Sequence, residues 1–182
     1  MTCIVGYIDR ENHKIIIGGD SAGISGLSLS HRKDPKVFIR EPFIMGFTSS
    51  FRMGQLLMCD DRFSIRIQKP DESDYAYMIS AFIPSIQKLF SDGGYLKENN
   101  NVKSGGTFIV GYKNNLYMIE NDFQIAEYNE DYCVCGCGED FALGSLFTST
   151  GSAKERIETA LKAAEYNSTG VSSPFKILEL EY

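Results

Sequence analysis

The chain has 182 residues, of which 43% are apolar and 23% are charged. These proportions are those of an ordinary globular protein, so they exclude a disordered, collagen-like or fibrous chain and fit one domain over residues 1–182. A total of 18 Lys and Arg against 24 Asp and Glu gives a net charge of −6, the wrong sign for gripping nucleic acid or an anionic membrane through overall charge.

Two hairpins are predicted within the first fifty residues. Apolar and β-branched residues concentrate in segments 2–8 and 14–20, which a polar turn separates, and again in segments 36–39 and 43–47. The segment 21–30 between these hairpins is rich in Gly and Ser, so it is expected to be a loop.

After the second hairpin, apolar residues recur at the spacing of a helix. This spacing predicts one helix over 50–59 and a second over 74–90, and Pro84 should kink or divide the second. Beyond them, Gly93-Gly94 and Asn99-Asn100-Asn101 are typical of a loop.

The second half of the chain repeats this order of strands before helices. Strands are predicted over 106–112, 116–119, 124–128 and 132–137, with a helix after Gly138. Ser152 and Glu155 form a capping box that begins a helix extending to about Tyr166, and a terminal strand is expected over 175–180. Such grouping favours an α+β fold with two antiparallel sheets between helical layers, a four-layer αββα sandwich.

The five cysteines are an odd number, and Cys133, Cys135 and Cys137 alternate along one predicted strand. Alternation favours reduced thiols on one face of that strand, and the spacing does not match a zinc site. No apolar run reaches the roughly 20 residues needed to cross a bilayer, and the start lacks a secretory signal. We therefore expect a cytoplasmic protein.

The beginning of the chain, Met1-Thr2, allows a particular kind of catalysis. Initiator Met is usually trimmed when a small residue follows it, and trimming would give Thr2 a free α-amine. An amine with a pKa of about 7.7–8.0 can accept the hydroxyl proton of the same residue at neutral pH. Many unrelated chains begin with Met-Thr, so the other motifs in the chain decide whether this dipeptide indicates catalysis.

Three further motifs support a catalytic role for Thr2. Gly18-Gly19-Asp20 closes the second strand, Lys36 stands 16 positions beyond Asp20, and Cys135-Gly136-Cys137-Gly138 precedes a helix. Together with Met1-Thr2 and the segment 45–50, this ordered set resembles the HslV-type, proteasome-like peptidases of the N-terminal-nucleophile hydrolase superfamily. The resemblance extends over nearly the whole chain, although residues 60–105 match it in helical character more than in residue type.

The resemblance implies roles for three residues. Thr2 would attack the peptide carbonyl, Lys36 would depress the pKa of the Thr2 hydroxyl and amine, and Asp20 would orient Lys36. An ester-linked acyl-enzyme would form, and water would then hydrolyse it. Taken singly, Asp20 is equally well a carboxylate in a turn and Lys36 a charge at a strand edge; it is their combination with Thr2 that favours catalysis.

Supporting positions depart from the family. Ser49 aligns where a glycine usually offers its backbone N–H to the oxyanion, and Cys137 replaces a serine near the terminal amine. Thr169 matches a supporting serine, whereas Tyr166 stands where proteasome-type chains have an Asp. Relatives of the HslV type can also hold a monovalent cation through backbone carbonyls, which here would lie near Glu165–Val171.

The resemblance also implies partners. It predicts that the chain assembles with copies of itself into a ring or stacked rings, and the apolar stripe 78–90 is consistent with such contacts. It also predicts that the substrate is unfolded polypeptide. The chain has no P-loop, so a separate AAA+ ATPase would have to unfold that substrate. Two alternatives remain: a non-catalytic proteasome-like subunit, which a retained Met1 would favour, and an amidase of the same superfamily that acts on a small amide.

Overall fold

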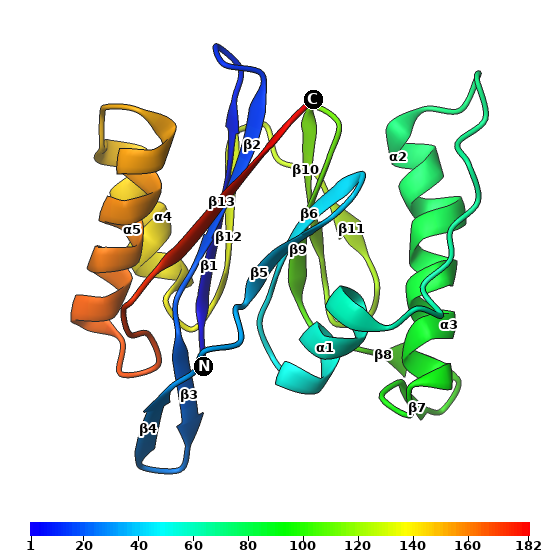
Figure 1. The fold of residues 1–182 in the computed structure, drawn as a ribbon, viewed down its shortest axis with the longest axis horizontal. Helices are drawn as coiled ribbons and strands as arrows, with labels where there is room; N and C mark the ends of the chain where they lie inside the picture. Colours follow the sequence, from blue (N-terminus) through cyan, green and yellow to red (C-terminus); the bar gives the residue numbers. More distant parts are fainter.

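The computed structural model describes residues 1–182, and its body consists of two antiparallel sheets (Figure 1). The first has the strand order β12-β1-β2-β13 and is formed by Tyr132–Gly136, Cys3–Asp9, Lys14–Gly19 and Lys176–Glu181. The second has the order β11-β10-β9-β6-β5 and is formed by Ile125–Ala126, Asn115–Ile119, Phe108–Tyr112, Phe43–Phe47 and Val37–Arg40.

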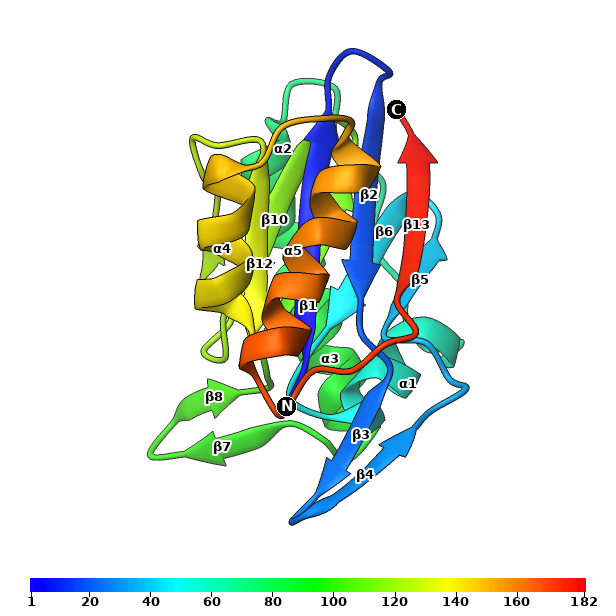
Figure 2. The ribbon, with the colours of Figure 1, turned by 90° about the vertical axis from the view of Figure 1, so that its left-hand side faces the viewer.

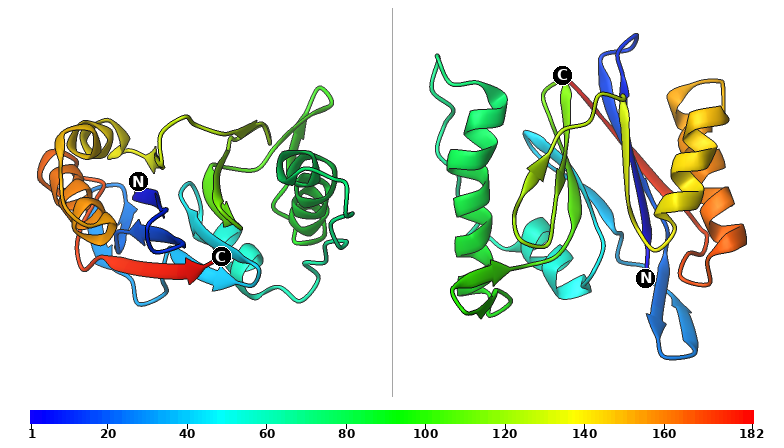
Figure 3. Two further views of the ribbon diagram at one scale, coloured as in Figure 1. Left: turned by 90° about the horizontal axis from the view of Figure 1, so that it is seen from above. Right: turned by 180° about the vertical axis from the view of Figure 1, so that it is seen from behind.

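Helices lie beyond both sheets. Figure 1 and the rear view in Figure 3 show α4 (Glu139–Thr148) and α5 (Ala153–Asn167) beside the first sheet. On the far side of the second sheet lie α1 (Phe51–Cys59), α2 (Asp74–Tyr77), the π-helix η1 (Met78–Phe82) and α3 (Ile83–Asp92). None of these helices has both the length and the apolarity to cross a membrane.

Two short hairpins project at the end of the molecule where the N-terminus lies, as Figure 2 shows. They are β3 (Ala22–Ser25) with β4 (Ser28–His31), and β7 (Lys97–Asn99) with β8 (Val102–Ser104). The sequence predicted loops in both places. In the first hairpin Gly26 provides a turn residue with φ of 58°, and neither hairpin carries the apolar runs that signal a buried strand.

Branched aliphatic side chains fill the space between the two sheets. Ile4 and Ile17 from the first sheet pack with Ile44 and Ile109 from the second, and each of the four is fully buried. A separate aromatic-rich cluster joins the second sheet to α1, η1 and α3, and an aliphatic one joins the first sheet to α4 and α5. This packing makes the sheets a rigid frame for the strand ends.

The structure confirms a mixed α and β fold with antiparallel sheets. The capping box of Ser152 and Glu155 is present, and α5 ends one residue beyond the predicted Tyr166. Residues 74–92 are helical without a break, because α2, the π-helix η1 and α3 follow one another directly. Pro84, which was expected to kink or divide this helix, lies in the first turn of α3. The strand predicted over 124–128 is shorter, because only Ile125–Ala126 pair with β10.

One expectation about the cysteines is wrong. Cys133 and Cys135 are buried on one face of β12, but Cys137 lies beyond the end of that strand and is exposed. Gly136 has φ of 106°, which turns the chain and ends the alternation. All five cysteines are free thiols.

The close approach of the sheets predicts a cost for any side chain at Gly46. A Cβ there would lie 2.5 Å from Ile4 Cγ2 and 2.9 Å from Ile17 Cγ2, both on stiff branched side chains. We expect Gly46→Ala to lower the free energy of unfolding by about 1–3 kcal/mol in urea titrations.

The matched control is Gly144→Ala, because Gly144 is an exposed residue within α4 and a Cβ there would have no neighbour within 4 Å. Helix propensity predicts that this variant gains up to about 1 kcal/mol. Equal effects of the two substitutions would contradict the close approach of the sheets at Gly46.

Candidate active site

Thr2 immediately precedes β1, an inner strand of the first sheet. Its carbonyl oxygen accepts a hydrogen bond from Gly138 N at 3.4 Å. A Cβ at Gly136 would lie 2.3 Å from that same oxygen, so only glycine permits this approach of the two chains. The Thr2 side chain is thereby fixed in place by the turn that follows β12, and Thr2 is 4% exposed.

Asp20 and Lys36 meet the Thr2 hydroxyl. Lys36 Nζ lies 2.9 Å from Thr2 Oγ1, 2.9 Å from Asp20 Oδ1 and 3.0 Å from Asp20 Oδ2. Asp20 follows β2 and Lys36 precedes β5, so the contact joins the first sheet to the second. Both charged residues are 2% exposed, which makes this a buried ion pair.

Backbone amides from three segments saturate the Asp20 carboxylate. Oδ1 accepts from Cys3 N at 3.1 Å, and Oδ2 accepts from Ala22 N at 2.9 Å and Ser172 N at 3.4 Å. With the two contacts from Lys36, the carboxylate has five hydrogen bonds, so its orientation is fixed. Residue types do not reveal these amide donors, since a backbone N–H is common to every residue except proline.

Burial lowers the pKa of the Lys36 ammonium, because desolvation penalises the charged form, while the attraction of Asp20 opposes that shift. The ammonium is therefore held as a donor beside Thr2 Oγ1 by one carboxylate. Burial also raises the pKa of the neighbouring Cys3 thiol. That thiol stays protonated at neutral pH, so it is not a reactive thiolate.

Ser49 lies in the turn between β6 and α1 and borders the same small cavity as Thr2 and Lys36. Its φ of 60° is in the left-handed region that favours glycine, which agrees with the glycine usual there in the family. Ser49 Oγ accepts from Thr107 N at 3.2 Å, while the Ser49 N–H makes no hydrogen bond within the chain.

Cys137 lies on the other side of Thr2. Thr2 N lies 3.2 Å from Cys137 Sγ, and Ser168 Oγ approaches the same sulfur at 3.5 Å. Ser168, which the sequence analysis did not single out, is therefore a neighbour of Cys137. Thr169 is exposed, and its hydroxyl makes no hydrogen bond to Thr2, Lys36 or Cys137. Tyr166 is also exposed and does not replace the missing acid.

In the segment Glu165–Val171, where a cation was expected, some of the oxygen atoms already accept hydrogen bonds from the chain. The Ser168 carbonyl accepts from Val171 N at 3.2 Å, and Glu165 Oε1 accepts from Ser173 N at 2.6 Å. No group of three or more His, Cys, Asp or Glu side chains is arranged to hold a metal ion. The monovalent cation expected there would be held by backbone carbonyls instead, so it stays a prediction, and no step of the chemistry is assigned to it.

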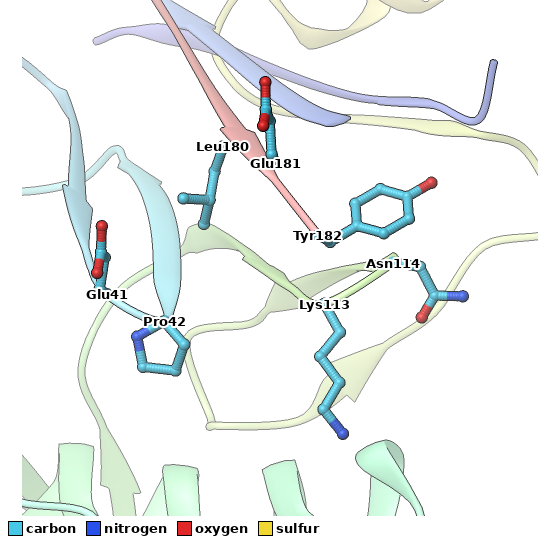
Figure 4. A pocket seen from close by; sticks show the side chains of 7 residues that line it. All are labelled: Glu41, Pro42, Lys113, Asn114, Leu180, Glu181 and Tyr182. Carbon is cyan, nitrogen blue, oxygen red and sulfur yellow. The ribbon is translucent and has the colours of Figure 1, made fainter. Parts of the chain in front are cut away.

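A much larger cavity, of about 630 Å³, lies elsewhere (Figure 4). It is bordered by the β5–β6 turn, the β9–β10 turn and the end of β13, and its lining residues are Glu41, Pro42, Lys113, Asn114, Leu180, Glu181 and Tyr182. None of the predicted site residues lines it. Size alone therefore does not locate the chemistry in this protein.

Comparisons with solved structures support the fold. The chain superposes on Thiobacillus denitrificans BPH with a TM-score of 0.79 and 15% identity, covering 100% of this chain and 98% of that one. It superposes on eukaryotic HslV from Trypanosoma brucei with a TM-score of 0.68 and 14% identity, covering 100% of both chains. It superposes on the Anbu (Gly-1) mutant from Hyphomicrobium sp. strain MC1 with a TM-score of 0.70 and 14% identity, covering 100% of this chain and 82% of that one.

The BPH protein has also been solved in complex with epoxomicin, and that structure matches with a TM-score of 0.78 and 14% identity over 99% of this chain and 98% of that one. No protein-family model matches the sequence. No curated protein matches it either. The predicted resemblance to HslV-type, proteasome-like proteins is confirmed as a likeness of fold over almost the whole chain.

The buried pair of Asp20 and Lys36 predicts strong energetic coupling. Asp20→Asn or Lys36→Met leaves a buried charge without its partner, which costs about 3–5 kcal/mol. We expect the double variant to be markedly less destabilised than the sum of the two single variants in urea titrations.

The control for this cycle is the exposed pair of Lys88 and Asp92, whose Nζ and Oδ2 atoms are 2.7 Å apart on α3. The Lys88→Met and Asp92→Asn substitutions should add with almost no coupling, because solvent screens that pair. Additive effects at Asp20 and Lys36 would show that the two groups are not the buried ion pair described above.

Proposed function

We propose that this chain is an N-terminal threonine peptidase, the subunit of a self-compartmentalising, proteasome-like, ATP-dependent protease. Residues 1–182 would form one domain, a four-layer αββα sandwich of the N-terminal-nucleophile hydrolase type. The observation that carries the proposal is the contact of Lys36 Nζ with Thr2 Oγ1 at 2.9 Å, made by an ammonium that both oxygens of Asp20 hold in a buried site.

The proposal requires removal of Met1. In the chain as it stands, Thr2 N belongs to a peptide bond and cannot accept a proton, and Thr2 Oγ1 donates to the Met1 carbonyl. Met1 is 58% exposed, so it projects from the site rather than filling the core. Its removal would produce the α-amine and free the hydroxyl proton for transfer to that amine.

The chemistry then uses groups already in place. The α-amine takes the proton from Thr2 Oγ1, and the oxygen attacks the carbonyl carbon of the substrate peptide bond. The amine next gives a proton to the leaving nitrogen, which departs as the C-N bond breaks and leaves an ester on Thr2. Water then gives a proton to the amine as its oxygen attacks the carbonyl carbon of the ester. The bond from that carbon to Thr2 Oγ1 breaks, Thr2 Oγ1 takes the proton back from the amine, and the acid product is released. Lys36 stabilises the developing alkoxide throughout.

The tetrahedral intermediates need a hydrogen-bond donor for their oxyanion, and the free N–H of Ser49 supports that role. It belongs to the turn that borders the cavity containing Thr2. A backbone amide is fixed by its turn, so it needs no reorganisation as charge develops. Cys137 would accept from the α-amine and so help to direct it toward Thr2 Oγ1.

Assembly and partners extend the proposal. The likeness of fold to HslV from Trypanosoma brucei supports a ring or stacked rings of this chain that enclose the Thr2 sites. Unfolded polypeptide would be delivered by a separate AAA+ ATPase, and the location would be the cytoplasm. These elements rest on the resemblance and on the sequence.

A second candidate is a proteasome-like subunit without activity. One observation favours it: a thiol, a poorer hydrogen-bonding group than a hydroxyl, lies beside Thr2 N at Cys137. The two candidates differ in a single measurable property, which is whether a processed Thr2 reacts with an electrophile.

The test begins with the intact mass of the purified protein, which shows whether Met1 has been removed. The processed protein is then incubated with a peptide epoxyketone, and the modified residue is located by peptide mapping. We expect one adduct, on Thr2, and we expect Thr2→Ala to lose the adduct and at least about 10³-fold of the peptide cleavage. Thr2→Ser should retain both.

The matched control is Thr159→Ala, because Thr159 is an exposed threonine on α5 whose hydroxyl donates to the Glu155 carbonyl. It should react as the unaltered protein does. A processed chain that forms no adduct, or Thr2→Ala with undiminished cleavage, would overturn the peptidase proposal and favour the inactive subunit.

A further inference from the structure

The last strand of the chain, β13, lies at the edge of the first sheet. It pairs with β2 on one side and with no strand on the other. Figure 1 shows β13 in front of the other strands, with no further element in front of it. An unpaired strand edge presents a row of backbone N–H and C=O groups with which a strand of another chain can pair.

The register of β13 on β2 shows which backbone groups point outward. Tyr182 N donates to the His13 carbonyl at 3.1 Å, so these two residues form a hydrogen-bonded pair. In an antiparallel ladder such residues alternate with residues whose N–H and C=O groups point away from the partner strand. Counted back from Tyr182, the outward groups belong to Ile177, Glu179 and Glu181. These groups take no part in the ladder with β2, and no loop of the chain bonds them.

The side chains of β13 alternate between its two faces. Leu178 and Leu180 pack against the aliphatic cluster between the sheets. Glu179 and Glu181 belong to the opposite face and are exposed. Figure 4 shows the Leu180 side chain on the side of Pro42 and the Glu181 side chain on the other side of the strand. A strand added to β13 would therefore have apolar neighbours on one face and acidic neighbours on the other.

The acidic face carries more negative than positive charge. Asp9 pairs with Lys14 between β1 and β2, and Lys14 pairs with Glu181 between β2 and β13. Lys14 Nζ lies 3.2 Å from Glu179 Oε2 and 3.8 Å from Glu181 Oε1. One ammonium thus serves three carboxylates. The next position across the sheet, opposite Glu181 on an added strand, suits a cation because opposite charges on neighbouring strands attract.

The cavity of about 630 Å³ in Figure 4 lies at the end of β13. Most of its lining surface is apolar, and Leu180 and Pro42 contribute to it. The Lys113 ammonium is already bound by Asp74 at 2.6 Å, so the cavity offers no free cation to an acidic side chain. A side chain opposite Leu180 on an added strand would lie about 4.5–5.5 Å from it, within reach of this cavity. Burial there favours an apolar side chain.

A second copy of β13 fits this edge poorly. Glu179 is the middle one of the three outward residues. Antiparallel pairing of two copies with the fullest overlap would therefore place the two Glu179 side chains opposite each other. Like charges directly opposite destabilise a strand pair. The acidic residues thus act against pairing between copies of this chain and in favour of a basic partner.

We infer that the outer edge of β13 binds an extended segment of another protein, in which basic and apolar residues alternate, as an added antiparallel strand. Basic side chains lie opposite Glu179 and Glu181, and apolar side chains lie opposite Leu178 and Leu180. Main-chain hydrogen bonds to the outward groups supply affinity, and the alternating side chains supply selectivity. This inference assigns a partner and does not rest on the proposed function.

The test uses a fluorescently labelled peptide, acetyl-Val-Lys-Val-Lys-Val-Thr amide, whose residues would lie opposite positions 182 to 177 in that order. Binding to the full-length protein is followed by fluorescence anisotropy. We expect saturable binding. We expect the peptide with Glu in place of both Lys residues to bind at least about 10-fold more weakly, because it would place like charges opposite Glu179 and Glu181.

Methylation of the peptide backbone distinguishes strand addition from simple charge attraction. In the added strand the N–H groups of the two Lys residues point to β13, and those of the second and third Val residues point away. N-methyl groups on both Lys residues should weaken binding at least about 10-fold, and N-methyl groups on those two Val residues, the matched control, should change it less than about 2-fold. Equal losses from the two peptides would overturn the inference.

A charge reversal in the protein tests the acidic face. Glu181→Lys should weaken binding of the Lys peptide at least about 5-fold and strengthen binding of the Glu peptide. The matched control is Glu98→Lys, because Glu98 is exposed on β7, in a hairpin at the other end of the molecule (Figure 2). It should leave both affinities unchanged. Equal weakening by the two variants would show that binding follows overall charge, which would overturn the inference.

Hydrogen exchange followed by mass spectrometry locates the bound peptide. The outward amides of Ile177, Glu179 and Glu181 should exchange rapidly in the free protein and slowly in the complex, because only the complex gives them acceptors. Absence of saturable binding, or slowed exchange elsewhere without any in 176–182, would overturn the inference and leave the chemistry of Thr2 untouched. The peptidase proposal is decided separately, by the epoxyketone adduct.

Discussion

The ion pair between Asp20 and Lys36 is the constraint on which the site depends. Two buried charges are expensive to remove from water, and their attraction offsets that cost only when every remaining hydrogen-bonding position is satisfied. Here the carboxylate receives Cys3 N, Ala22 N and Ser172 N in addition to the ammonium. These donors come from β1, from β3 and from the segment that follows α5, so the pair forms only when all three segments are in place.

The fold delivers this arrangement through the register of its strands. Ile4 pairs with Gly19 between β1 and β2, which sets the start of β1 beside the end of β2 and so places Thr2 near Asp20. Lys36 comes from the other sheet, whose position is set by the branched aliphatic side chains between the sheets. The distance from Lys36 Nζ to Thr2 Oγ1 is therefore a property of sheet packing as much as of the two residues.

The order of strands and helices and the trio of Thr2, Asp20 and Lys36 could be read from the sequence, because apolar periodicity and ordered motifs carry them. The hairpins β3–β4 and β7–β8 could not, since short exposed strands lack such periodicity. The contact of Ser168 with Cys137 was missed because the turn after α5 brings these two residues together, and residue type does not reveal the path of that turn. Amide donors such as Ser172 N could not be predicted either, because almost every residue type has a backbone N–H.

Two of the three departures from the family, Ser49 and Cys137, still offer hydrogen-bonding groups at the site, whereas the third, Tyr166, is exposed. A residue with a Cβ at the left-handed position of Ser49 costs about 1–2 kcal/mol relative to glycine, yet the Ser49 hydroxyl accepts from Thr107 N and so compensates part of that cost. The Ser49 N–H stays free. Likewise the Cys137 sulfur lies at hydrogen-bonding distance from Thr2 N. Both substitutions therefore leave in place the two hydrogen-bonding positions, the Ser49 N–H and the Cys137 sulfur, on which the proposed reaction of Thr2 depends.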